Sequence, residues 1–412
     1  MKPLILVAGY TRTQNVEKLF KLFPEGDTLV GCTYHRQPTS DIKKAYLQKF
    51  DVVFDLNNSV DVDKLKSEDN VLCVTCTQER DMSAYIQTLL LCKKITKEQA
   101  DAYELVINKH TFKESIQISA PHLVPKHHLI TNDSLEDIAT LTYPQVIKPT
   151  GLAGSAMIKI VHSPEELLSH YNEFRHYIQD IGSKHFNKKI EIVSEEYITG
   201  PQYSVNTYIN RFGETTLCPI IRIITPQEFN SGDTYSALQY TTNELSVSAV
   251  LALTEAIQKI VDHFCIQNTS AHFDMVLHET GWKCFEVGLR IGGFRQDIYQ
   301  YSFKMDHFKN DILNRLGKQV VIPQQKKVTC VVQKAADEVG VLQKISYERS
   351  IDTSEVNLVH ESKIRKIGEK VAPVSGGGAT LTRHFVVGKN EDSVLRDSHT
   401  LYNSIQFDLE TR

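Results

Sequence analysis

Short apolar runs alternate with longer amphipathic stretches over the first quarter of the chain. Continuous apolar runs are typical of strands buried on both faces, and the stretches between them have helical spacing. This alternation predicts a small parallel α/β sheet covered by helices on both faces. No G-x-G-x-x-G follows the first predicted strand, so the dinucleotide-binding fingerprint is absent. The predicted strands are Leu4–Val7, Leu29–Cys32, Val52–Phe54 and Val71–Val74, and the predicted helices are Val16–Leu22, Asp41–Phe50 and Met82–Lys94.

The pattern changes in the middle of the chain, where strand-like runs come with hairpin turns. Two amphipathic helices stand out there, one capped by Ser163 with Glu166 completing a capping box, and one over 246–265. Toward the C-terminus short β-like runs dominate, and Ser375–Gly378 is predicted to be a flexible turn. We therefore expect three units, namely an α/β domain over 1–108, a middle domain over 109–317 with a lid subdomain at about 140–200, and a mostly antiparallel, β-rich cap over 318–412.

Composition and charge narrow the class of protein. The 412 residues, 41% hydrophobic and 23% charged, are typical of two or three globular domains and exclude a disordered or fibrous chain. A net charge of −4 argues against a dedicated binder of nucleic acid or of an anionic membrane, and no apolar run approaches the ~20 residues that span a bilayer. Cys73 and Cys76 form a single C-x-x-C with no second pair. We expect free buried thiols and a cytoplasmic protein.

An acidic pair is the most informative chemical signal. Alternation on both sides of Glu279-Thr280-Gly281 predicts a hairpin with a three-residue loop, in which His278 faces Trp282 and Asp274 lies opposite Glu286. Two carboxylates that lie directly opposite each other on neighbouring strands repel each other unless a cation or a shared proton is present. Mg²⁺ bound by carboxylates and substrate phosphates meets this need. A solvent-facing acidic pair is the alternative, and a register slip of one residue would remove the pairing.

Two further segments suit a nucleotide. A strand ending in Lys148 is followed by a small-residue loop, Gly151 to Ser155, whose backbone N–H groups could approach a phosphate; a plain hairpin is the alternative. The turn from Glu195 to Gln202 offers backbone groups to a purine edge, although such a turn is more often a solvated rim. Arg290 and Arg295 follow the acidic pair, where they could hold a carboxylate or an acyl-phosphate oxygen, or lie on the surface.

Taken in this order, the motifs resemble the ATP-grasp superfamily, and most closely its carboxylate–amine ligases acting on amino acids. The resemblance implies an ATP-grasp fold with an N-terminal parallel α/β domain, a split ATP-binding domain and a β-rich C-terminal cap. It also implies roles for individual residues. Lys109 and Lys148 would bind phosphates, Gly151, Gly154 and Ser155 would close over them, Glu195, Glu196, Tyr197 and Ile198 would read adenine, Asp274 and Glu286 would hold the metal, and Arg290 and Arg295 would stabilise the reacting groups.

Two positions depart from the family pattern. Gln202 stands where many members have a ribose-binding glutamate, and an amide can still hydrogen-bond a hydroxyl. Gly288 stands where many have a metal-binding asparagine, which leaves water or phosphate oxygen to complete the Mg²⁺ shell. His272, opposite Gly288 in the predicted hairpin, would help to bind substrate or would simply pack beside the site.

The resemblance implies an enzyme that uses ATP with one or two Mg²⁺ ions, or Mn²⁺, to join a small carboxylate to an amine. The carboxylate would be activated as an acyl phosphate and the amine would then form an amide, with amino-acid-like substrates expected. One alternative is a bicarbonate-activating, biotin-carboxylase-like enzyme, and another is a non-catalytic ATP sensor or scaffold. We expect no nucleic-acid or membrane partner, and the branch is compatible with a homodimer.

Overall fold

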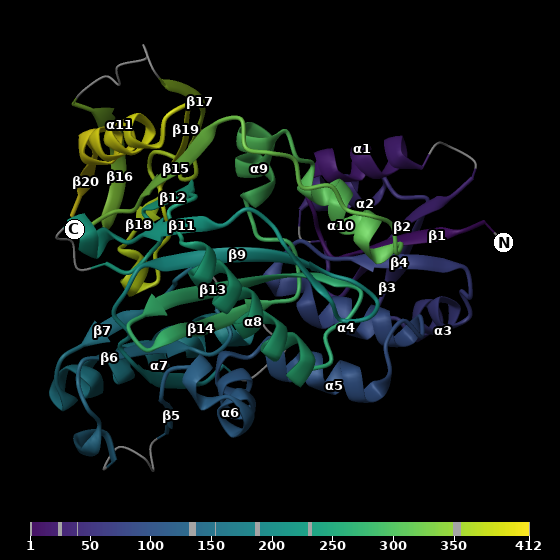
Figure 1. The fold of residues 1–412 in the computed structure, drawn as a ribbon, viewed down its shortest axis with the longest axis horizontal. Coiled ribbons are helices and arrows are strands. Elements are labelled where there is room, and N and C mark those ends of the chain that lie inside the picture. The colour runs from purple at the N-terminus through teal and green to yellow at the C-terminus, as the bar shows by residue number, and fades with distance from the viewer. Residues whose placement is uncertain are drawn as a thin grey trace.

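The computed structural model describes residues 2–23, 27–38, 40–131, 137–152, 154–185, 190–229, 233–348 and 356–411. Figure 1 shows the N-terminal domain on one side of the molecule, the lid below and the C-terminal strands above, with a long central sheet between them. None of the described helices is both long enough and apolar enough to cross a membrane.

The N-terminal domain is the predicted parallel sheet. Its four strands lie in the order β3-β2-β1-β4, all parallel. Every predicted strand and helix of this region is present, and the apolar patterning left two helices unpredicted, α3 and α5. The elements are β1 (Leu4–Ala8), α1 (Thr13–Leu22), β2 (Leu29–Tyr34), α2 (Asp41–Leu47), β3 (Val52–Asp55), α3 (Ser59–Lys66), β4 (Val71–Thr75), η1 (Glu79–Asp81), α4 (Met82–Leu91) and α5 (Lys97–Val106).

A small antiparallel sheet forms the lid, in the order β5-β8-β6-β7. Helix α7 covers one face of it, where Leu167 and Phe174 pack on Ile147 in a separate hydrophobic cluster. The predicted cap is present, because Ser163 Oγ accepts a hydrogen bond from the Glu166 N–H at 3.2 Å. The elements are α6 (Lys109–Ser119), η2 (Pro121–Leu123), β5 (His127–Ile130), η4 (Asp137–Thr140), β6 (Gln145–Pro149), β7 (Lys159–Val161), α7 (Pro164–His185) and β8 (Ile192–Glu196).

Within the described residues, the central sheet has nine strands, running β14-β13-β9-β11-β12-β15-β19-β17 with β10 added at β9. Helix α8 packs its apolar side on the β13–β14 end of this sheet, and α10 packs Phe308 and Ile312 into the core of the N-terminal domain. The elements are β9 (Gln202–Ile209), β10 (Thr215–Leu217), β11 (Ile221–Ile224), η5 (Pro226–Phe229), β12 (Leu238–Thr241), α8 (Val247–His263), β13 (Thr269–His278), β14 (Gly281–Gly288), α9 (Arg295–Phe303) and α10 (His307–Arg315).

The C-terminal strands are divided between the central sheet and a small separate sheet. Three of them, including β15, extend the central sheet, because Leu238 of β12 pairs with Val332 of β15 across the expected boundary at residue 318. The others form a small sheet in the order β18-β16-β20 beside α11. The domain limits therefore remain a prediction. The elements are β15 (Val328–Lys334), β16 (Gly340–Tyr347), β17 (Val356–Lys363), β18 (Lys370–Val371), η6 (Val374–Gly376), β19 (Thr382–Gly388), α11 (Glu391–Ser404) and β20 (Ile405–Glu410).

The β13–β14 hairpin confirms the acidic pair but corrects its register. The predicted pairing of His278 with Trp282 is wrong, because His278 pairs with Gly281 and Trp282 with Leu277. One residue of β14, Phe285, is then bulged out, and beyond it Asp274 pairs with Glu286 as predicted. A bulge opposes two residues to one, so it compensates for the shorter turn.

Candidate active site

The acidic pair lies on the face of the hairpin that looks toward α6 and the lid. Asp274 and Glu286 are direct cross-strand partners, and both are partly buried. Burial and the neighbouring charge of Glu286 raise the pKa of Asp274. Burial also opposes the ionisation of Glu286, but the neighbouring cations, of which Lys109 has the largest effect, together outweigh it and the pKa of Glu286 is lowered. The pair therefore carries excess negative charge that a cation would neutralise.

Two carboxylates facing each other are a donor set that suits Mg²⁺, which commonly takes one or two carboxylates and completes its shell with water and substrate phosphate. Within the described residues no group of three or more His, Cys, Asp and Glu side chains is arranged to hold a metal ion. Asp274 and Glu286 would therefore hold a metal only together with oxygen atoms that the substrate or water supplies.

Lys109 joins the acidic pair to the small-residue loop. It lies in the first turn of α6, where Asn108 caps the helix by accepting a hydrogen bond from the His110 N–H. Its Nζ lies 3.2 Å from Glu286 Oε2 and donates a hydrogen bond to Leu152 O at 2.7 Å. One ammonium group thus contacts both the hairpin and the predicted phosphate loop.

The second predicted phosphate lysine, Lys148, has a buried carboxylate partner. Its Nζ lies 2.8 Å from Glu195 Oε2, and Lys113 Nζ lies 2.8 Å from Glu195 Oε1. Lys113 is fully buried, which lowers its pKa to about 8. Burial would raise the pKa of Glu195, but the two lysines hold it below its ordinary value. Sequence reasoning gave Lys113 no role, although its position one helical turn after Lys109 was a usable signal.

Glu195 therefore occupies a different place from the one expected. It was predicted to read adenine through backbone groups, but its backbone lies inside β8, paired with His127 of β5 and Val146 of β6. Its side chain contacts the two lysines, and the residue is 1% exposed. The carboxylate of Glu195 is placed to set the charge of Lys113 and Lys148, and its role in reading adenine stays a prediction.

The rest of the predicted adenine segment links the lid to the central sheet. Glu196 ends β8 and its N–H donates to Lys126 O, while the Tyr197 N–H donates to Pro144 O at 3.3 Å. Ile198 is buried. Gln202 opens β9, where it pairs with Val276, two residues beyond Asp274 on β13. These predicted residues therefore follow one another from the lid toward the acidic pair.

The predicted phosphate loop has unusual backbone angles at its centre. Gly154 has φ +72° and Ser155 has φ +60°, and a Cβ on Gly154 would meet nothing within 4 Å. Glycine is needed there for its backbone conformation rather than for space. Just after the loop, the Met157 N–H donates to Val374 O at 3.0 Å. The segment beside Ser375–Gly378, expected to be a flexible turn, thus touches the lid.

Arg290 is held by the N-terminal domain. Its Nε and Nη2 lie 2.9 and 2.8 Å from Oε2 of Glu79, the first residue of η1, which follows β4. Sequence reasoning missed Glu79, although ligand-binding residues often follow the carboxyl ends of parallel strands. Arg295 is 8% exposed, its Nε lacks a hydrogen-bond partner within the described chain, and burial lowers its pKa although Asp274 acts against this.

His272 explains the departure at Gly288. The two residues are cross-strand partners, as predicted, and the imidazole lies against the glycine backbone. A Cβ built on Gly288 would lie 2.1 Å from His272 Cε1. Burial and the nearby Arg290 lower the pKa of His272 to about 3, so the ring is neutral. The space that an asparagine would need at position 288 is filled by His272.

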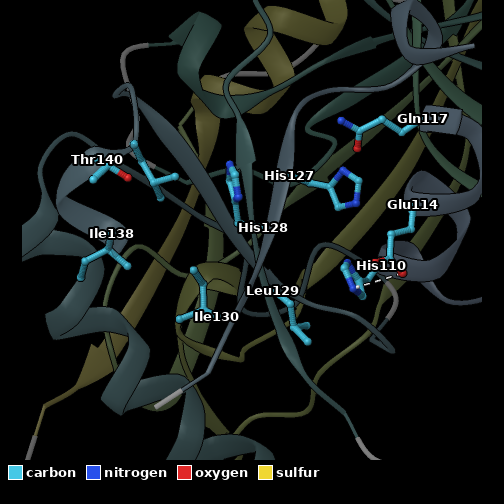
Figure 2. A pocket seen from close by; sticks show the side chains of 10 residues that line it. His110, Glu114, Gln117, His127, His128, Leu129, Ile130, Ile138 and Thr140 are labelled. Atoms are coloured by element: carbon cyan, nitrogen blue, oxygen red, sulfur yellow. Dashed lines mark ion pairs between the residues drawn. The ribbon is translucent and has the colours of Figure 1, made fainter. Parts of the chain in front are cut away.

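A pocket of about 600 Å³ lies elsewhere, at the edge strand β5 between α6 and η4. Figure 2 shows His110 beside Glu114, with His127 near them, and the centres of the two imidazole rings are 5.4 Å apart. His110 Nε2 lies 3.6 Å from Glu114 Oε2. None of the residues predicted for the active site lines this pocket.

Comparison with known proteins identifies a domain family and a fold. Residues 141–298 match the family model of the ATP-grasp domain. The chain therefore contains an ATP-grasp domain and has the ATP-grasp fold, as expected. This stretch covers the lid loop, the segment around Glu195 and the acidic hairpin, whereas Lys109 lies before it. A search of curated proteins finds no match.

Solved structures resemble the whole chain. An L-amino acid ligase from Bacillus licheniformis is similar over 100% of this chain and 99% of its own, with a TM-score of 0.75 and 16% identity. N5-carboxyaminoimidazole ribonucleotide synthetase from Thermotoga maritima is similar over 100% of both chains, with a TM-score of 0.62 and 15% identity. A third structure is the biotin carboxylase domain of 2-oxoglutarate carboxylase from Hydrogenobacter thermophilus, solved with MgADP and bicarbonate. It is similar over 99% of this chain and 91% of its own, with a TM-score of 0.62 and 13% identity. At these identities the likeness concerns the fold.

Proposed function

We propose that the protein is an ATP-dependent ligase that joins a small carboxylate to an amine, with release of ADP and phosphate. The convergence of two lysines with a pair of facing carboxylates carries this proposal, because Lys109 contacts Glu286 and Lys148 lies 5.7 Å from the ring centre of Phe285, next to Glu286, whose pKa it helps to lower. The lysines suit phosphate oxygens and the carboxylates suit Mg²⁺, which is the arrangement that phosphoryl transfer needs. The full-length likeness to an L-amino acid ligase supports amino-acid-like substrates.

The first step would be in-line attack of a substrate carboxylate oxygen on the γ-phosphorus of ATP. The bond from that phosphorus to the β,γ-bridging oxygen breaks, so the products are an acyl phosphate and ADP. Lys109 and Lys148 would hold phosphate oxygens, exchanging their present contacts with Glu286 and Glu195 for the nucleotide. Mg²⁺ held by Asp274 and Glu286 would supply neutralisation of the charge on the phosphates. Arg290, fixed by Glu79, would orient the reacting carboxylate.

The second step would be attack of the amine nitrogen on the acyl carbon. The bond from that carbon to the phosphate oxygen breaks, phosphate leaves, the nitrogen loses a proton, and an amide remains. No side chain of the site needs to act as a nucleophile in this scheme. Catalysis would rest on positioning and charge stabilisation by the lysines and arginines.

The test is release of ADP and phosphate from Mg²⁺-ATP with a panel of amino acids, alone and in pairs, and with bicarbonate separately. Release that requires a pair, with a product mass equal to the two substrates minus water, is the expected result. Release with bicarbonate and no amine would replace the proposal with a carboxylase. ATP binding without turnover on the whole panel would instead favour an ATP sensor.

A further inference from the structure

Four arginines from all parts of the chain meet beside the acidic hairpin, around the start of α9. Figure 1 shows this helix between the C-terminal strands and the N-terminal domain. Arg12 comes from the N-terminal domain, Arg290 and Arg295 follow the hairpin, and Arg383 lies on β19. So many cations in one place need anions to balance them.

Two of the four have carboxylate partners. Arg290 is bound by Glu79, and Arg12 donates from Nη1 to both carboxylate oxygens of Asp297, at 2.9 and 2.8 Å. The other two, Arg295 and Arg383, form no ion pair with any carboxylate of the described residues, although Asp274 is close enough to attract Arg295. The charge of these two is therefore not balanced by a direct contact with the protein.

Arg295 and Arg383 share one aromatic ring. The guanidinium carbon of Arg295 lies 5.1 Å from the centre of the Phe294 ring, and that of Arg383 lies 4.5 Å from the same centre. The two guanidinium groups therefore cannot be farther apart than the sum of these two distances. Arg295 is among the charges that lower the pKa of Arg383, so the two like charges repel each other, which a shared anion would relieve.

Neither side chain is a loosely held surface group. Arg295 is 8% exposed, and its Nε has no hydrogen-bond partner among the described residues. Arg383 is half-buried and is oriented by Gln333, whose Oε1 accepts from Arg383 Nε at 3.0 Å. Gln333 is itself fixed, because its Nε2 donates to Ser236 O at 3.1 Å. Burial lowers the pKa of both arginines, as expected for cations that lack an ionic partner.

We propose that Arg295 and Arg383, held on the ring of Phe294, bind a second carboxylate of the substrates, distinct from the one that is phosphorylated. This inference rests on the proposed ligase function. The charges that act on Arg295 include Asp274 and Arg290, whereas those that act on Arg383 are Arg12, Asp297 and Arg295. An anion at Arg383 would therefore be separate from a carboxylate that reacts at Arg290 and the acidic pair. The second carboxylate comes either from the amine substrate or from a dicarboxylic acid.

Binding can be tested without turnover. Mg²⁺ and a non-hydrolysable ATP analogue would first occupy the phosphate lysines, and sulfate would then be titrated by calorimetry as the anion probe. We expect Arg383→Gln to weaken sulfate binding about tenfold, and Arg383→Lys, which keeps the charge but loses the planar fork, to weaken it less. Arg211→Gln is the matched control, since Arg211 lies 4.7 Å over the ring of Phe212 at an exposed turn. Equal binding by wild type and Arg383→Gln, or none by wild type, overturns the proposal.

Kinetics then identify the source of the carboxylate. For each active pair of substrates, the amine substrate is compared with the analogue whose carboxylate is converted to a carboxamide. The acid substrate is compared with an analogue that differs only in having or lacking a second carboxylate. The substrate that supplies the anion should show an increase in KM of about tenfold in Arg383→Gln, with kcat little changed. If neither replacement nor variant changes KM, the proposal is wrong. If no pair releases ADP while sulfate still binds, the ligase function fails instead.

Discussion

Glu195 and the pair formed by Asp274 and Glu286 are buried to different extents and have opposite charge environments. Glu195 has a lysine on each carboxylate oxygen, both at 2.8 Å. Asp274 instead faces another carboxylate across the hairpin, and only Glu286 of the two has a lysine, Lys109 at 3.2 Å. The first group is neutralised within the protein, whereas the second retains unbalanced negative charge.

This difference separates structural from functional acidic groups. A buried carboxylate with two ion pairs contributes to the folded state, and removing it strands the lysines. A carboxylate pair that repels itself costs stability, and such a cost is typical of sites that bind a cation. Substitutions should therefore have opposite consequences at the two places.

The largest effect is expected at the acidic pair. Asp274→Asn or Glu286→Gln should lower kcat/KM for ADP release about 10³-fold or more, because the Mg²⁺ contact is lost. Asp274→Asn removes one charge of a repelling pair and should leave the melting temperature unchanged or higher, whereas Glu286→Gln also removes the ion pair with Lys109 and should lower it. Glu279→Gln, at the exposed turn of the same hairpin, is the control and should retain activity. Near-normal activity in both variants would contradict the site assignment.

Glu195→Gln should act on stability instead. Loss of the charge leaves Lys113 and Lys148 without their partner, at a cost of about 3–5 kcal/mol in the free energy of unfolding, measured by denaturant titration. Glu173→Gln removes an exposed partner 2.7 Å from Lys159 and should cost less than about 1 kcal/mol. Similar losses of unfolding free energy in the two variants would show that the buried ion pairs of Glu195 contribute no more to stability than an exposed one.

Gly288→Asn, which restores the residue common in the family, should destabilise the protein by about 1–3 kcal/mol because His272 occupies the space. The double variant His272→Ala with Gly288→Asn should recover most of that loss. A double-mutant cycle on unfolding free energies measures the coupling between the two positions. Additive effects would mean that the imidazole can move away at little cost.

The last predicted effect is a pH dependence of stability caused by Lys113. Its pKa is lowered from 10.5 to about 8 in the folded protein, so between these values the unfolded chain binds more protons. Stability should therefore rise with pH across this window, by up to about 1.4 kcal/mol per unit from this group. Lys113→Met should remove that slope, measured as the difference in unfolding free energy between the two proteins from pH 8 to 10.5. If the unfolding free energy of Lys113→Met rose with pH as steeply as that of the wild type, Lys113 would not be the cause of the pH dependence.

Local patterns in the sequence predicted much of the fold. The four buried strands of the N-terminal domain and the cap at Ser163 depend on neighbouring residues, so they can be read directly. The acidic pair was predicted with the wrong turn, because the alternating pattern on each strand does not reveal a bulge. Phe285 adds one residue to β14 where the shorter turn removed one, and Asp274 meets Glu286 in either case.

The sequence by itself determined which residues carry charge and chemistry and in what order they occur. Only the tertiary structure decided which charges meet. Glu79 with Arg290 and Glu195 with Lys113 join residues that are far apart in the chain, and Arg383 reaches the site because β19 joins the central sheet. Such contacts arise from the packing of separate elements, and no local periodicity encodes the partner of a buried charge.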